Sequence, residues 1–81
     1  MTTKFYIEFI DNSKNCNFVL QSKWFNSQQI AEKWLIDEFD FVDFEKFSIF
    51  VMCADFDDDG DFGDITQSRQ ITKEEYLKIK K

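Results

Sequence analysis

The sequence predicts an α+β fold in which an antiparallel sheet of about four strands packs on one main helix, with a short C-terminal helix. Four segments alternate apolar and polar residues as strands do, and one segment places apolar residues at helical spacing. The 81 residues have room for one domain, and their 15 aromatic side chains supply enough apolar bulk for its core. We therefore expect residues 1–81 to form a single compact domain with the order β-β-α-β-β-α.

The first two strands are expected to form an antiparallel hairpin. Residues 4–11 alternate, and a polar, turn-rich connection follows over residues 11–17. Residues 18–25 alternate again, with Leu20 and Trp24 on one face and Phe25 on the other. The two segments are close enough in sequence to pair directly.

The main helix is predicted over residues 27–39. Asn26 or Ser27 begins it, because either side chain can accept a hydrogen bond from the free amides of the first turn. One apolar stripe at helical spacing then follows, formed by Ile30, Ala31, Trp34, Leu35 and Phe39.

The second half of the chain predicts two more strands and the short helix. Residues 45–54 are apolar on both faces, which is typical of a strand in the middle of a sheet. Residues 65–71 are more polar and are expected at an edge. Thr72 and Glu75 fit a capping box, so the last helix should run from Lys73 to the end of the chain.

One sheet face remains without a predicted cover, because one long helix buries only one side of a sheet. Tyr6, Phe50 and Met52 lie opposite the better core positions. Either the short helix and loops cover this second face or another molecule does, as a homodimer or a different partner. The sequence leaves both alternatives open.

Charge is unevenly distributed along the chain. The chain has 16 acidic and 10 basic residues, a net charge of −6. Residues 37–64 hold eleven of the acids and one base, a net charge of −10, whereas the remainder carries +4. Binding to nucleic-acid phosphates requires a broad positive patch, so we do not expect direct binding to DNA or RNA. A basic protein surface is the natural complement.

The most acidic stretch, residues 55–64, first suggests a calcium loop. Asp55, Asp57 and Asp59 alternate before Gly60, as ligands one, three and five precede the glycine of an EF-hand loop. The resemblance ends at position twelve, where Thr66 replaces the bidentate glutamate, and the preceding segment alternates like a strand. A calcium-binding module with Asp55, Asp57 and Asp59 as ligands is therefore the alternative function.

A β-hairpin is the second interpretation of this stretch. Asp59 and Gly60 form a strong turn dipeptide between two predicted strands. A turn needs one or two acids and not six, so it leaves most of the aspartates unexplained except as solvated side chains.

The third interpretation, which we prefer, is a recognition surface. Its expected residues are Asp55, Asp57, Asp58, Asp59, Asp61 and Asp64, with Asp40 and Asp43 as an extension if the two groups converge in space. Such a surface would imitate a phosphate backbone and attract a basic partner over long range. Interleaved phenylalanines would supply apolar anchors, namely Phe39, Phe41, Phe44, Phe56 and Phe62.

In size, acidity and compact α+β pattern, the chain resembles small phage or mobile-element proteins that block host defence nucleases, including anti-CRISPR proteins and DNA mimics. The resemblance rests on composition and on the acidic block of residues 37–64, and it assigns no residue role. It implies an inhibitor that binds a basic, nucleic-acid-binding protein surface.

Catalysis is not expected. The chain has no histidine, and it contains no Gly-rich phosphate loop, nucleophile elbow or zinc-protease motif. Cys16 and Cys53 form no recognisable disulfide or metal framework, and Cys53 should be buried. No cofactor is expected outside the calcium alternative. No apolar run reaches the length of a signal peptide or membrane span, so we expect a cytoplasmic protein.

Overall fold

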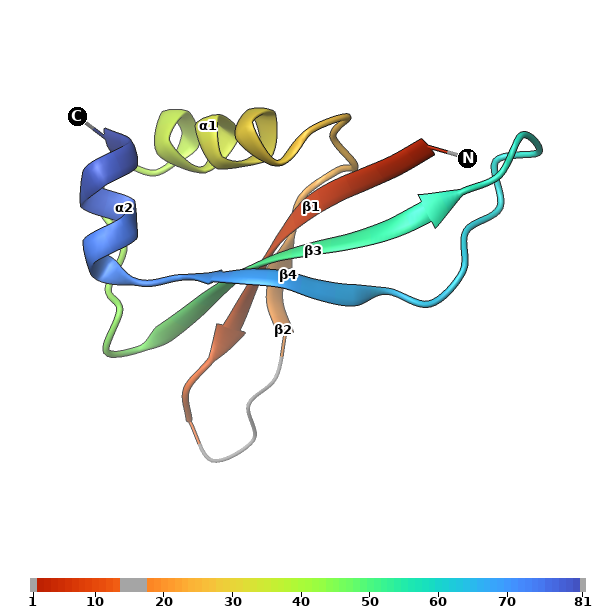
Figure 1. Ribbon diagram of the computed structural model, residues 1–81. Helices are drawn as coiled ribbons and strands as arrows, with labels where there is room; N and C mark the ends of the chain where they lie inside the picture. Colours follow the sequence, from red (N-terminus) through yellow and green to blue (C-terminus); the bar gives the residue numbers. More distant parts are fainter. Residues whose placement is uncertain (1, 14–17, 81) are drawn as a thin grey trace.

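The structure, a computed structural model that describes residues 2–13 and 18–80, has the predicted α+β architecture (Figure 1). Within these residues the element order is β-β-α-β-β-α. The bounds are β1 Thr2–Asp11, β2 Phe18–Gln21, α1 Gln28–Glu38, β3 Phe47–Phe56, β4 Thr66–Ile71 and α2 Lys73–Lys80.

The sheet has the strand order β2-β1-β3-β4, and every neighbouring pair is antiparallel. β1 and β3 form its centre and pair over ten residues each, from Thr2 opposite Phe56 to Asp11 opposite Phe47. The predictions of a β1–β2 hairpin, of a central third strand and of an edge position for the fourth are confirmed.

The core lies between one face of the sheet and the two helices. Ala31 and Leu35 of α1 are fully buried against the sheet, and Tyr76 brings α2 into the same cluster. The sheet contributes Ile7, Phe9, Ile49, Val51 and Ile71. Burial of each such side chain stabilises the fold by about 1.5–3 kcal/mol before entropy costs.

The start of α1 resolves the choice between two predicted caps. Ser27 is the N-cap, and its Oγ accepts a hydrogen bond from the amide of Ile30 at 3.1 Å. The predicted apolar stripe is partly wrong, because the Ile30 side chain is 51% exposed while Ile36 packs against the core. Ala31 and Leu35 are four positions apart and define the buried face, and Ile30 lies to one side of it.

The start of α2 keeps one half of the predicted capping box. The Thr72 Oγ1 atom accepts a hydrogen bond from the Glu75 amide at 3.3 Å. The Glu75 carboxylate lies 3.6 Å from Nη2 of Arg69 on β4. The glutamate therefore connects α2 to the edge strand.

The second strand is shorter than predicted, and its end changes which face two aromatic residues occupy. Ser22 exchanges two hydrogen bonds with the Ile7 backbone, and Phe25 exchanges two with that of Phe5. On β1, only Tyr6 lies between Phe5 and Ile7. On the facing segment, two residues, Lys23 and Trp24, lie between Ser22 and Phe25. The extra residue acts as a β-bulge and reverses the alternation. Phe25 is thus in the core and Trp24 on the opposite face, contrary to the prediction.

The second sheet face carries neither helix. Tyr6 and Glu8 on this face are nevertheless only 6% and 4% exposed. Trp24, in the connection between β2 and α1, lies edge-on to Tyr6 with 4.8 Å between ring centroids, so a loop side chain covers part of this face. The alternative in which α2 provides the cover is wrong, because α2 belongs to the α1 side.

Candidate interaction site

The connection between β3 and β4 is an ordered hairpin at one end of the sheet (Figure 1). The Asp57 amide donates to the Asp61 carbonyl at 2.8 Å, and the Gly60 amide donates to the Asp57 carbonyl at 3.2 Å. Gly60 has a φ of 87°, a conformation that glycine adopts without strain. The turn interpretation of Asp59 and Gly60 thus describes the backbone correctly.

One aspartate organises this hairpin from within. The Asp57 Oδ1 atom accepts hydrogen bonds from the amides of Asp59 and Asp61, both at 3.0 Å. This is the local side-chain to backbone pairing by which aspartate favours turns. Asp55 is also engaged, since its Oδ1 accepts a hydrogen bond from Thr3 Oγ1 at 2.5 Å.

All six aspartates of this stretch are solvent-exposed, and we call them together with their turn the acidic hairpin (residues 55–64). In the part of the chain that the structure describes, none of the six forms a salt bridge. Asp58, Asp59 and Asp64 have no hydrogen bond to their carboxylates from described residues. The acidic hairpin therefore presents a concentrated negative charge to solvent.

An aromatic cluster lies directly beside the acidic hairpin. It consists of Trp24, Phe56 and Phe62, with ring centroids 4.9–5.4 Å apart. Phe62 belongs to the hairpin itself and is 48% exposed. The backbone bridge between Phe56 and Phe62 holds the two rings on the helix-free face of the sheet. Carboxylates and partly exposed rings thus meet at one end of the molecule.

A cation also contacts this cluster. The Lys4 Nζ atom lies 5.0 Å from the centroid of the Phe56 ring. An ammonium group at this distance is attracted by the face of the ring. The aromatic cluster therefore already accommodates one positive group from its own chain.

Further along the helix-free face, a carboxylate is buried among sheet side chains. The Glu8 Oε1 atom accepts hydrogen bonds from the Tyr6 hydroxyl at 3.0 Å and from Gln21 Nε2 at 3.2 Å. Desolvation by burial, together with the Glu8 hydrogen bond and charge, raises the pKa of Tyr6 to about 12. These two residues form a local polar network within the sheet.

Asp40 and Asp43, the predicted extension, lie at the other end of β3. The acidic hairpin follows this ten-residue strand and they precede it, a separation of roughly 30 Å at the usual rise per residue (Figure 1). The Asp43 carboxylate accepts a hydrogen bond from the Glu45 amide at 3.0 Å and so shapes a turn, while the Asp40 carbonyl binds Lys80. The two acidic groups do not converge.

The five phenylalanines considered as anchors also separate. Phe56 and Phe62 lie in the aromatic cluster, whereas Phe39 and Phe44 pack against the core. Phe41 is 78% exposed, but it lies with Asp40 at the distant end. Only two of the five are therefore placed beside the acidic hairpin.

The calcium alternative receives no support from the arrangement of side chains. Among residues 2–13 and 18–80, no three Cys, Asp or Glu side chains are grouped as metal ligands. One oxygen of Asp57, an expected ligand, is used by two backbone amides, and a strand instead of a helix precedes the loop. Calcium binding by Asp55, Asp57 and Asp59 stays a prediction.

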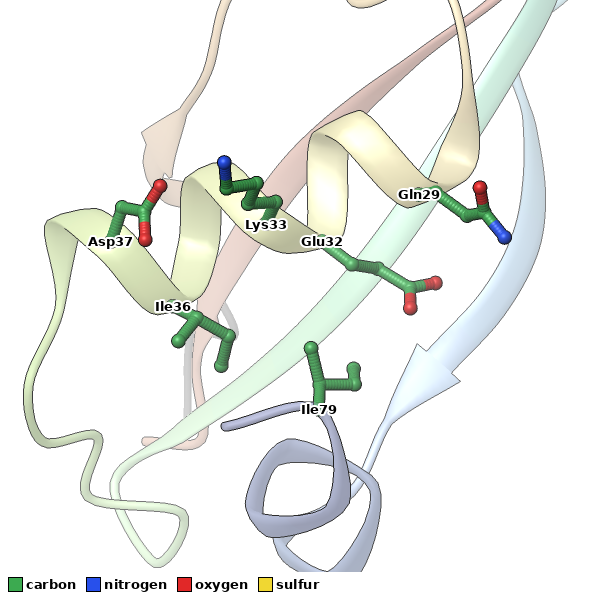
Figure 2. Close-up of a pocket in the computed structure, with 6 residues that line it drawn as sticks. All are labelled: Gln29, Glu32, Lys33, Ile36, Asp37 and Ile79. Atoms are coloured by element: carbon green, nitrogen blue, oxygen red, sulfur yellow. The ribbon is translucent and has the colours of Figure 1, made fainter. Parts of the chain in front are cut away.

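A groove also lies between α1 and α2 (Figure 2). Ile36 and Ile79 supply its apolar lining, and the polar residues are Gln29, Glu32, Lys33 and Asp37. Glu32 is engaged by Arg69, with Nε 3.3 Å from Oε2. The charged lining of the groove is thus one lysine and two carboxylates. The lining contains no histidine or described cysteine that could act with them in catalysis.

Sequence reasoning missed Trp24 and Glu8 as neighbours of the site. Strict alternation predicts Trp24 on the core face, and the bulge reverses this alternation. A signal for Glu8 existed, since a glutamate between Tyr6 and Ile10 on one strand face is an unusual neighbour for apolar residues. Cys53 is half-buried rather than buried, with its Sγ 3.5 Å from Thr66 Oγ1. Cys16 lies outside the described residues.

Comparisons of this chain with protein-family models, with curated proteins and with solved structures give no match. In the described ranges, neither helix is long and apolar enough to cross a membrane. The function must therefore be argued from the acidic hairpin and its surroundings.

Proposed function

We propose that this chain is a non-enzymatic acidic interaction protein whose acidic hairpin binds a basic protein surface that otherwise binds nucleic acid. The observation that carries the proposal is the set of six exposed aspartates without a salt bridge to any described residue. Carboxylates left without a counter-ion attract a cationic partner and accelerate its association.

The aromatic cluster supports the same proposal, because charge alone gives little affinity at an exposed surface. Phe62 is half exposed and belongs to the acidic hairpin, so a partner that meets the aspartates also meets an apolar ring. Aromatic residues near the centre of an interface typically supply much of its binding energy. The proposed site therefore combines charge for steering with an apolar anchor.

The proposed site is limited to the acidic hairpin and the aromatic cluster. Asp40 and Asp43 are excluded because they lie at the opposite end of β3. Within this proposal the protein acts as a phage or mobile-element inhibitor of the DNA-mimic or anti-CRISPR type, which occupies the groove of a nucleic-acid-binding protein in the cytoplasm.

A capture experiment with matched variants tests the proposal. The site variant carries Asp58→Asn, Asp59→Asn and Asp61→Asn, which spare the turn-forming carboxylate of Asp57. The control carries Asp37→Asn, Glu38→Gln and Asp40→Asn, the same change in charge at the other end of β3. Each protein is immobilised and exposed to a cell lysate at about 50 and about 500 mM salt, with EDTA throughout.

We expect the wild type and the control to retain one basic protein at low salt, and the site variant to retain at least about tenfold less. High salt or added duplex DNA should release the captured protein, because both compete for the same positive surface. Equal capture by the site variant and the wild type would refute the proposed site. A captured protein that duplex DNA does not displace would refute the mimicry.

A further inference from the structure

The outer edge of β4 is open. One side of this strand pairs with β3, and no other described strand pairs with it. Its residues make no backbone hydrogen bond to the loops or caps of the described chain. β4 contains no lysine or proline, and its one charge, on Arg69, is engaged with Glu32 and Glu75. Apart from an irregularity in the pairing at Ser68, this edge lacks such protection and can accept another strand.

Charge changes sign from one end of this edge to the other. The acidic hairpin precedes β4, with Asp64 two residues before its first residue. Lys73 follows two residues after its last residue, at the start of α2. Both side chains are exposed, and neither has a salt bridge within the described residues. A second, antiparallel strand with an acid before it and a base after it would match negative charge to positive charge at both ends.

We propose that the partner on this edge is a second copy of the same chain, related by a two-fold axis. When β4 pairs symmetrically about a two-fold axis at its irregularity near Ser68, Thr66 lies opposite Ile71 of the second copy, and Asp64, just before the strand, comes near Lys73, just after it. The two-fold axis repeats the Asp64–Lys73 contact at the other end. The two four-stranded sheets then form one continuous sheet.

The same arrangement explains an exposed apolar side chain. Ile65 is 41% exposed and lies immediately before β4, where the second copy covers it. The contact is small, because six residues per copy bury less than the roughly 1,200–2,000 Å² of a stable interface. A shift in the pairing of β4 with β3 at Ser68 also bends the strand near the axis. The dimer is therefore weak and dissociates on dilution.

Charge exchange between Asp64 and Lys73 tests this dimer. Sedimentation velocity over a concentration series gives the dimer dissociation constant of the wild type, Asp64→Lys, Lys73→Asp and the double variant. Asp37→Lys, an exposed reversal on α1, is the matched control. We expect each single variant to weaken the dimer about tenfold, because two symmetric contacts become repulsive. The double variant should restore wild-type dimerisation, and the control should leave it within about twofold.

Amide hydrogen exchange of the wild type gives an independent measurement. Protection of β4 amides should rise with protein concentration, whereas protection of β2, the other edge, should not. A wild type that stays monomeric at about 1 mM would refute the proposal. So would a dimer insensitive to both single variants, or one that the double variant fails to restore. Asp64→Lys and Lys73→Asp change residues that the capture experiment leaves unchanged, so the two proposals fail separately.

Discussion

The six aspartates of the acidic hairpin are not equivalent. One carboxylate oxygen of Asp57 accepts hydrogen bonds from two backbone amides, and Asp57 therefore helps to form the turn. Asp58 and Asp59 have no such role for their side chains among the described contacts and extend the charge into solvent. A substitution at Asp57 would change both shape and charge, so only its neighbours report on recognition alone.

The acidic hairpin requires a glycine at position 60 because of the backbone conformation there. A side chain at its φ of 87° is strained, although the space around it is open. Gly60→Ala should therefore lower the free energy of unfolding by about 1 kcal/mol. Gly63→Ala is the matched control, because Gly63 also faces open space but lacks a positive φ. Urea denaturation measures both, and equal effects would show that the Gly60 conformation does not matter.

Tyr6 should make stability fall at high pH. Burial and Glu8 raise its pKa to about 12 in the folded protein, against an ordinary value of 10.0. The folded state therefore keeps the proton more tightly, so this stabilisation is complete below pH 10 and is lost as the pH rises through 12. Urea denaturation of the wild type and of Tyr6→Phe isolates the effect from other titrating groups. Parallel losses in both proteins between pH 10 and 12 would contradict it.

At the scale of elements, the N-terminus of α1 provides a direct test of local sequence reasoning. Ser27→Ala removes the acceptor for the Ile30 amide and should cost about 1 kcal/mol of stability. Asn26→Ala changes the neighbouring residue that pattern alone could not exclude as the cap, and it should change stability by less than about 0.5 kcal/mol. Thermal denaturation measures the two variants together. A larger loss of stability for Asn26→Ala than for Ser27→Ala would show that Ser27 is not the N-cap.

Strand and helix types were predictable, but the face of each side chain was not always so. The alternation of β1 and β3 and the polarity of β4 placed these strands correctly. The bulge before Phe25 depends on paired hydrogen bonds with β1, and no residue type between Gln21 and Phe25 predicts it. Because a one-residue insertion moves every following side chain to the other face, Trp24 and Phe25 exchanged places.

At the scale of the whole molecule, the acidic block of residues 37–64 is divided between the two ends of β3. The acidic hairpin was predictable as a local unit, because its turn residues and charges are contiguous. Whether Asp40 and Asp43 join it depends on the direction of β3, which places them at opposite ends. The molecule is 39 Å long, so its ends can carry different surfaces. Sequence alone could define the charges but not their convergence.

The pairing of β1 with β3 also governs the order in which the chain can fold during synthesis. Thr2 is paired with Phe56, so the middle of the sheet cannot be completed until residue 56 has left the ribosome. Contacts this distant in sequence close slowly. Until then, Ile7 and Phe9 have no β3 neighbour, and the nascent hairpin exposes apolar side chains that a chaperone can shield.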